Sequence, residues 1–263
     1  MIKRDVCSAY LSRMGGRKRN EDACGYWTSK AGCCWVVSDG AGGHGGGDIA
    51  SRLVVKTVLE RFAANPVVAG ETVVQLLQAA HEEVMRAKQA EPQVGDMHAT
   101  CVLLLIDRET GLSVWGHAGD SRAYLFRHDQ LVFQTRDHSL VQSMIDAGYG
   151  STEMIRSHPQ RSLLTSAIGN AGELLVSAAE TPVELEAGDA FLLCSDGWWE
   201  AIEEPQMEKE LAAAPDMNAW LESMAAWIEA HVKTGHDNFT GLAVQLREPE
   251  DEVFVQFAEP SAT

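Results

Sequence analysis

The sequence predicts an α+β fold in which antiparallel β-sheets pack together between outer layers of helices. Apolar runs of strand length recur at 33–37, 101–106, 191–194 and 242–246. Several of these runs are apolar at consecutive positions, so both faces of the strand must be covered. Short turn segments at 108–111 and 127–130 separate strand-like stretches. Such turns indicate antiparallel hairpins rather than the crossovers of a parallel sheet.

Two regions have the apolar spacing of helices. The first, between residues 48 and 90, predicts a consecutive helix pair, and the second spans 217–228 with Asp216 as its N-cap. The apolar positions are Val54, Val58, Phe62, Val73, Leu77, Ala80, Val84, Met217, Trp220, Leu221, Met224, Trp227 and Ile228. A stripe with helical spacing most often packs into a core, so we assign these residues to the core.

The composition excludes several classes of protein. The chain has 263 residues, 45% of them hydrophobic, which is enough for a folded core. Its formal charge of −17 would repel a nucleic acid or an anionic membrane. No apolar stretch reaches the roughly 18–20 residues of a membrane span, and no signal peptide is evident. We therefore expect a cytoplasmic protein without nucleic-acid or membrane partners, whose six cysteines are mostly buried thiols.

No linker, repeat or low-complexity segment divides the chain, so we expect a single domain over residues 1–263. The segment from Ser139 to about Arg161 is helical in part, contains Gly148, Gly150 and Pro159, and interrupts a strand-rich region. It is either an ordinary surface connection or a small insertion over a site. We term this segment, residues 139–161, the flap.

Four aspartates lie at the ends of predicted strands. Asp39 and Asp196 stand in matching apolar-Ser-Asp-Gly segments, Asp120 ends a third segment and Asp237 opens a fourth. Taken singly, each is typical of a turn. Brought together, they would either raise one another's pKa or bind divalent cations. The coincidence favours a site for Mg²⁺ or Mn²⁺, to which Gly40 can add its carbonyl oxygen.

A cluster of both charges, residues 17–22, stands out in a chain that is poor in basic residues. Its arginines have the planar guanidinium that suits bidentate binding of phosphate. The alternative is a solvated turn whose charges cancel. The glycine-rich loop 40–48 lacks the Gly-Lys-Ser/Thr ending of a nucleotide P-loop, so we do not assign it to nucleotide binding.

The order of these motifs resembles that of the metal-dependent protein phosphatases of the PP2C (PPM) family, especially the single-domain bacterial serine/threonine phosphatases. The matching segments are 17–22, 39–44, 119–124, 137–140, 164–169, 195–197 and 237–240. The resemblance covers nearly the whole chain and implies a four-layer αββα sandwich with two central antiparallel sheets. It also implies hydrolysis of phosphoserine and phosphothreonine in proteins.

The resemblance implies a centre of two Mn²⁺ or Mg²⁺ ions. Asp39 would bridge both ions, and Asp196 and Asp237 would complete one site. The Gly40 carbonyl would serve the other, with Glu21 joining directly or through water. The implied reaction is direct attack on phosphorus by a bridging water that the two cations ionise near neutral pH.

The resemblance assigns further roles around this centre. Asp120, with Asp196, would hold a weaker third metal, and Asp22 would lie near the metal waters. Arg17 matches the phosphate-binding arginine. For the proton of the leaving group, His44 and a metal-bound water are alternative donors.

His98, Ser166, Trp198 and Trp199 depart from the family pattern and put the docking of the flap and the peptide preference in doubt. They suggest an alternative, a catalytically silent relative that binds phosphoproteins as a sensor or scaffold. The complete ligand set favours an active enzyme. By resemblance, the partners are phosphorylated proteins, including a serine/threonine kinase and its substrates, and we expect a monomer.

Overall fold

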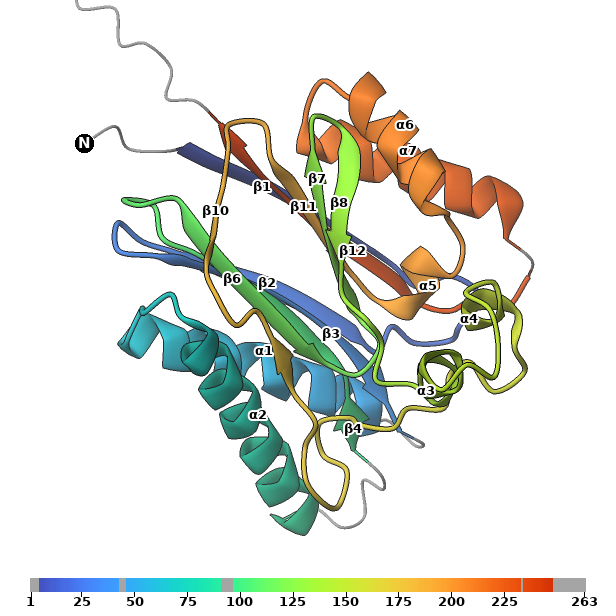
Figure 1. Cartoon of the computed structure of the whole chain (residues 1–263). Helices are drawn as coiled ribbons and strands as arrows, with labels where there is room; N and C mark the ends of the chain where they lie inside the picture. Colours follow the sequence, from blue (N-terminus) through green and yellow to red (C-terminus); the bar gives the residue numbers. More distant parts are fainter. Residues whose placement is uncertain (1–4, 43–45, 91–96, 233, 248–263) are drawn as a thin grey trace, which may run out of the picture.

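Two antiparallel sheets stack at the centre of the molecule between two layers of helices (Figure 1). The computed structural model describes residues 5–42, 46–90, 97–232 and 234–247. Helices α1 (Gly46–Ala64) and α2 (Gly70–Ala90) cover one sheet, and α6 (Glu204–Ala213) and α7 (Met217–His231) cover the other. The predicted αββα sandwich is confirmed.

The first sheet has the strand order β1-β12-β11-β7-β8. Its strands are β1 (Asp5–Arg13), β7 (Arg122–Arg127), β8 (Gln130–Gln134), β11 (Ala190–Cys194) and β12 (Phe239–Arg247). The first and last of these strands in the sequence are neighbours, with Arg13 opposite Phe239. This register places the loop that follows β1 beside the residues that precede β12.

The second sheet has the order β10-β6-β5-β3-β2, with β4 also paired to β3 and β9 to β6. Its strands are β2 (Asp22–Thr28), β3 (Cys33–Ala41), β4 (His98–Ala99), β5 (Cys101–Ile106), β6 (Leu112–Ala118), β9 (Ser177–Ala178) and β10 (Val183–Glu184). Asp22 lies opposite Asp39 in the β2 and β3 pairing. The turns at 107–111 and 128–129 close the predicted hairpins, β5 with β6 and β7 with β8.

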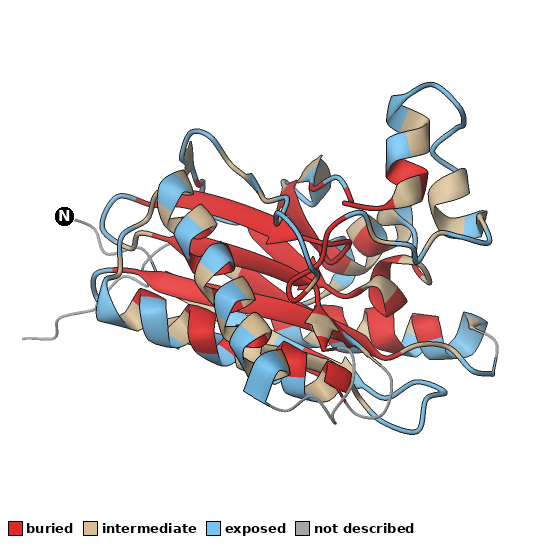
Figure 2. Cartoon of the chain, turned by 90° about the horizontal axis from the view of Figure 1, so that it is seen from below, coloured by how far each residue is buried: buried red, intermediate tan, exposed pale blue. Residues whose placement is uncertain are grey.

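The packing explains why the strands are apolar at consecutive positions. Along β3, Cys34 and Val36 pack under α1 and α2, whereas Trp35 and Val37 pack between the sheets. Figure 2 shows the buried strands, with helices that are buried on one side and exposed on the other. The predicted apolar helix positions are buried except Trp227, which is half-buried and stacks on His231 at 4.0 Å.

The predicted helix pair and the Asp216 cap of α7 are confirmed, with Asp216 Oδ1 accepting the Ala219 N–H at 2.8 Å. Helices α5 (Asp196–Trp199) and α6 were not predicted from the sequence. Helix α6 buries only Met207 and Leu211, so its apolar stripe is too short to stand out. Within the flap, α3 (Leu140–Asp146) and α4 (Met154–Ser157) bear out the prediction that this segment is partly helical.

All six cysteines are free thiols, and Cys7 and Cys24 are half-buried while the other four are buried. In the part of the chain that the structure describes, no helix has the length and apolar character needed to span a bilayer.

Candidate active site

The predicted site residues converge where strands of both sheets end. Asp39 lies near the end of β3, and Asp196 follows β11 as the first residue of α5. Asp237 lies two residues before the start of β12. Asp120 lies in the turn between β6 and β7. A cavity of about 300 Å³ at this place is lined by Arg17, Glu21, Asp39, Gly40, Ala41, Gly42, Thr100, Asp120, Ser162, Leu164, Asp196, Asp237 and Asn238.

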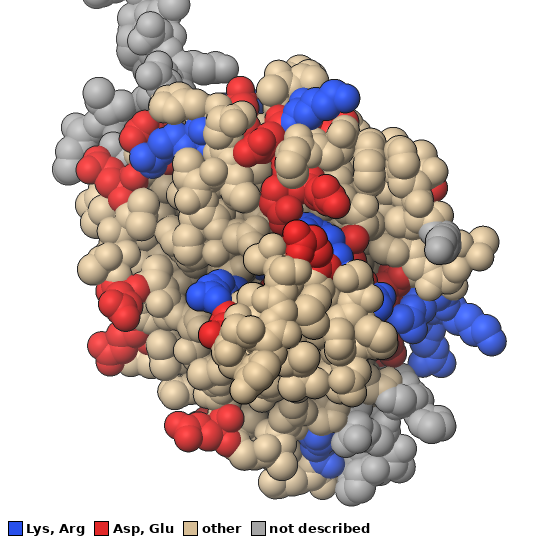
Figure 3. Space-filling view, turned by 45° about the vertical axis from the view of Figure 1, so that its right-hand side comes forward, with Lys and Arg blue, Asp and Glu red and all other residues tan. Residues whose placement is uncertain are grey.

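Seven of the nine predicted site residues therefore line one cavity. Asp22 is not among the lining residues, and its Oδ2 accepts a hydrogen bond from Ser195 Oγ at 2.8 Å. His44 lies outside the described residues, so its role stays a prediction. Figure 3 shows acidic side chains gathered on this side of the molecule, with basic side chains close to them.

The central carboxyl groups raise one another's pKa. Burial is the largest cause for Asp39, whose pKa lies well above its usual value, and Asp22, Asp196 and Asp120 add to the effect. Burial raises the pKa of Asp196 to about 7, with further increases from Glu200 and Asp237. Such a group carries its full negative charge only where a cation compensates it.

The surrounding carboxyl groups follow the same trend. Burial, then Asp196 and Asp137, raise the pKa of Asp120 well above its usual value, although Arg122 opposes this. Burial raises the pKa of Asp22 to about 6. The pKa of Glu21 is raised by burial and next by Asp48.

Arg17 and Asp237 form an ion pair at the mouth of the cavity, with 2.6 Å between Arg17 Nη2 and Asp237 Oδ2. The other carboxylate oxygen, Asp237 Oδ1, accepts the backbone N–H of Asn238 at 2.8 Å. The predicted phosphate-binding and metal-binding residues are thus in direct contact.

Asn238 fixes the loop between β1 and β2, and sequence reasoning assigned it no role. Its Nδ2 donates to the Met14 and Arg19 carbonyls at 2.8 Å each, and its Oδ1 accepts the Glu21 N–H at 2.9 Å. The residue is 5% exposed. Its position next to Asp237 was the signal that could have revealed it. These bonds place Arg17 and Glu21, which lie in the same loop.

Glycines allow the close approach of this loop to the residues before β12. Gly15 has φ +58°, and a Cβ there would lie 2.1 Å from the Asp237 carbonyl oxygen. The Gly16 N–H donates to the His236 carbonyl at 2.7 Å. On the other side of the cavity, a Cβ on Gly40 would lie 2.0 Å from the Gly47 carbonyl oxygen, so this position also requires glycine.

A second unpredicted group of side chains supports Asp120. Trp199 Nε1 donates to the Asp120 carbonyl at 2.9 Å, and the Arg122 guanidinium lies 3.5 Å above the Trp199 ring. Arg122 is itself held by two hydrogen bonds to Asp137, at 2.7 and 2.8 Å. Arg122 and Asp137 are both buried, so this ion pair is shielded from solvent. Trp199, a departure from the family pattern, thus has a structural role in this chain.

The flap contacts the elements that carry Asp196. Arg156 of α4 donates to the Trp199 carbonyl at 2.9 Å and to Glu204 at 2.7 Å. Arg161 donates to Glu200 at 2.7 Å. Ser162 and Leu164, which follow the flap, line the cavity.

The chemistry of this donor set fits hard divalent cations, because every side-chain donor is an oxygen. Asp22 Oδ1 and Asp196 Oδ1 are buried without a hydrogen-bond partner among the described residues. Within the same residues, no three His, Cys, Asp or Glu side chains converge closely enough to hold an ion by themselves. Ion binding therefore needs side chains to turn inward, or further donors such as backbone carbonyls and waters.

Comparisons with known proteins match most of the chain. Residues 12–238 match the family model described as protein phosphatase 2C. The serine/threonine phosphatase Stp of Listeria innocua is 29% identical over 235 residues, covering 87% of this chain and 91% of Stp.

Solved structures show the same fold. The Mycobacterium tuberculosis phosphatase PstP/Ppp superposes with a TM-score of 0.80 at 27% identity, over 92% of this chain and 99% of that one. A PstP catalytic domain in complex with two manganese ions has a TM-score of 0.74 at 25% identity, over 92% and 98% of the two chains.

Proposed function

The chain belongs to the protein phosphatase 2C family and is a metal-dependent protein-serine/threonine phosphatase, and we propose that the acidic cavity is its active site. The observation that carries this proposal is the convergence of Asp39, Asp120, Asp196 and Asp237 in one cavity with Arg17. No observation favours the catalytically silent alternative.

We assign the metal ligands from the family resemblance, and all of these residues line the cavity. Asp39 would bridge two ions, Asp196 and Asp237 would complete one site, and the Gly40 carbonyl with Glu21 would serve the other. Asp120 and Asp196 would hold a weaker third ion. Bound Mn²⁺ or Mg²⁺ would lower the pKa of water, orient it toward phosphorus and neutralise the phosphoryl oxygens.

Arg17 would bind the phosphoryl group of the substrate. Its guanidinium already lies at ion-pair distance from Asp237, so a phosphoryl group that takes this place is held next to the metal ligands. Asn238 keeps the loop of Arg17 in position. Arg17 then stabilises the charge that develops on the phosphoryl oxygens in the transition state.

Asp22 would accept and orient protons near the reacting water, because its pKa of about 6 lies close to neutrality. Its hydrogen bond from Ser195, the residue before Asp196, links it to the metal site. His44 stays the predicted proton donor to the leaving seryl or threonyl oxygen, with a metal-bound water as the alternative.

The wider setting is part of the same proposal. Residues 1–263 would form one domain in which the flap shapes substrate entry, as the cavity positions of Ser162 and Leu164 support. The protein would be a cytoplasmic monomer. It acts on phosphorylated proteins, and a serine/threonine kinase and the substrates of that kinase would be its partners.

Hydrolysis of p-nitrophenyl phosphate and of a phosphothreonine peptide tests the function. We expect turnover with Mn²⁺, none with excess EDTA, and a loss of at least about 100-fold in Asp39→Asn, whose fold is checked by circular dichroism. Asp129→Asn, in the turn between β7 and β8, is the matched control and keeps full activity. A metal-independent, active Asp39→Asn enzyme would refute the proposal.

A further inference from the structure

Two basic side chains beside the cavity have no part in the mechanism above. Lys18 and Arg19 follow Arg17 directly, and both are exposed. Neither forms an ion pair with another residue in the described ranges. They are therefore available to a ligand that binds next to Arg17.

The backbone that carries these side chains is held in place. The Arg19 carbonyl accepts a hydrogen bond from the buried Asn238 side chain, and the Gly16 N–H donates to the His236 carbonyl. These bonds hold the backbone from which Arg17, Lys18 and Arg19 extend. A phosphorylated residue bound at Arg17 would place its neighbours in the substrate close to Lys18 and Arg19.

Two other basic side chains near this end of the sheets are already paired with acidic residues. Arg13 is paired with Glu222, and Arg161 is paired with Glu200. Arg19 is near enough to Glu21 to lower the pKa of that carboxyl, so part of the charge of Arg19 is offset.

The rest of the molecule would disfavour an acidic ligand, because the formal charge of the chain is −17. An acidic peptide would be repelled from most of the surface and attracted only where basic charge is uncompensated. Charge complementarity of this kind sets specificity and orientation more than raw affinity.

We propose that Lys18 and Arg19 form a specificity surface that selects phosphoproteins with acidic residues next to the phosphoserine or phosphothreonine. This inference rests on the proposed function and adds the substrate class to it. Because both side chains are exposed, the selection acts through salt-sensitive attraction and not through a desolvated pocket.

Phosphothreonine peptides of equal length, flanked on both sides by glutamate, glutamine or lysine, test the proposal. We expect kcat/KM of the unmodified enzyme with Mn²⁺ to be about tenfold higher for the glutamate peptide than for the lysine peptide at low salt, and nearly equal at high salt. Lys18→Gln/Arg19→Gln should remove the preference, and Lys18→Glu/Arg19→Glu should reverse it.

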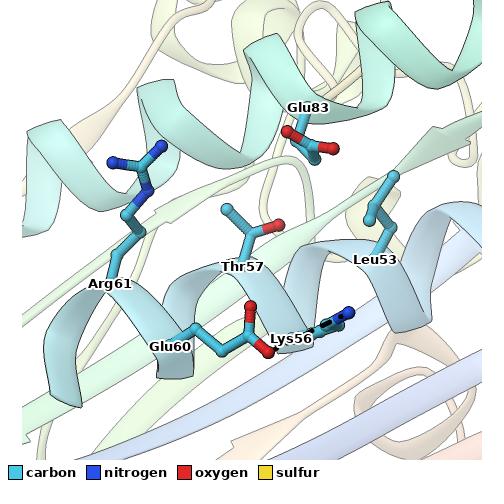
Figure 4. A pocket seen from close by; sticks show the side chains of 6 residues that line it. All are labelled: Leu53, Lys56, Thr57, Glu60, Arg61 and Glu83. Carbon is cyan, nitrogen blue, oxygen red and sulfur yellow. Dashed lines mark ion pairs between the residues drawn. The ribbon is translucent and has the colours of Figure 1, made fainter. Parts of the chain in front are cut away.

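A matched control removes the same charge elsewhere. Lys56 and Arg61 line a shallow pocket of about 190 Å³ between α1 and α2 (Figure 4). They lie about 14 and about 21 Å along α1 from Gly47, which packs against Gly40. Lys56→Gln/Arg61→Gln should keep the preference of the unmodified enzyme.

The outcomes separate this inference from the proposed function. Equal rates for the three peptides, or an unchanged preference in Lys18→Gln/Arg19→Gln, would overturn the specificity surface while p-nitrophenyl phosphate is still hydrolysed. Failure to hydrolyse either p-nitrophenyl phosphate or the peptides with Mn²⁺ or Mg²⁺ would overturn the proposed function, and the inference with it. Lys18→Gln/Arg19→Gln and Lys56→Gln/Arg61→Gln should hydrolyse p-nitrophenyl phosphate at rates within about twofold of the unmodified enzyme, since this substrate has no flanking residues.

Discussion

Asn238 joins the phosphate-binding and metal-binding parts of the active site. Its side chain makes three hydrogen bonds to the loop that carries Arg17 and Glu21, and its backbone N–H donates to Asp237. A buried amide whose donors and acceptor are all used cannot be replaced without leaving backbone groups unpaired. We therefore regard Asn238 as a positioning residue.

Replacing Asn238 by Asp tests this role, because the shape is kept while both Nδ2 donors are lost. We expect the inhibition constant for inorganic phosphate to rise and kcat/KM for p-nitrophenyl phosphate to fall about 10- to 100-fold, equivalent to about 1–3 kcal/mol. Circular dichroism should show an intact fold. In an Arg17→Ala background the change should have little effect on the phosphate constant. If the effects of the two substitutions on the free energy of phosphate binding were fully additive, the positioning role would be contradicted.

Several site residues could be predicted from the sequence because their side chains alone point to the chemistry. Acidic residues at strand ends and an arginine in an acidic chain are visible as residue types. Asn238 and Trp199 were not found, since each acts on a backbone carbonyl that is distant in sequence. Every residue has a backbone carbonyl, so the residue type of the acceptor does not indicate that such a hydrogen bond exists.

Among the elements, those with strong apolar patterns were predicted and the short ones were not. The strands β3, β5, β11 and β12 are buried on both faces, and α1, α2 and α7 bury long stripes. The short helices α5 and α6 depend on tertiary packing, because short helices have little stability of their own. The order of the strands in the two sheets was not predicted, because the spacing of apolar residues does not show which strands are neighbours.

The flap and α5 show why short elements matter for the site. Helix α5 begins at Asp196 and ends at Trp199, so one turn of helix carries a proposed metal ligand and the indole that supports Asp120. Arg156 of the flap binds the end of the same turn at the Trp199 carbonyl. Contact between the flap and the metal site therefore runs from α4 through α5 to the turn that carries Asp120. The spacing of apolar residues could not predict this contact.

In the whole molecule, the acidic cavity lowers stability unless cations are bound. The pKa of Asp196 is about 7 and that of Asp22 about 6, both above the value of about 3.9 for an unfolded chain. The folded state thus binds more protons than the unfolded state between about pH 4 and about pH 7, and the contribution of these groups to stability is lost as the pH rises through this range.

Denaturant unfolding in EDTA tests this consequence. We expect Asp196→Asn to be more stable than the unmodified protein by up to about 4 kcal/mol at about pH 8, because a pKa raised from about 3.9 to about 7 corresponds to about three pKa units, and to differ little at about pH 4. Mn²⁺ should stabilise the unmodified protein and should stabilise the variant much less. Asp129→Asn should behave as the unmodified protein. If the free energy of unfolding of Asp196→Asn depended on pH in the same way as that of the unmodified protein, the raised pKa of Asp196 would be contradicted.

The most direct measurement of the central claim is anomalous diffraction at the manganese edge from crystals soaked in Mn²⁺. We predict peaks within the cavity between Asp39, Asp196 and Asp237, with the Gly40 carbonyl among the ligands. Crystals of Asp39→Asn soaked in the same way should lack at least one of these peaks. Manganese bound only elsewhere, in crystals whose protein hydrolyses phosphopeptides, would contradict the assignment of this cavity as the metal centre.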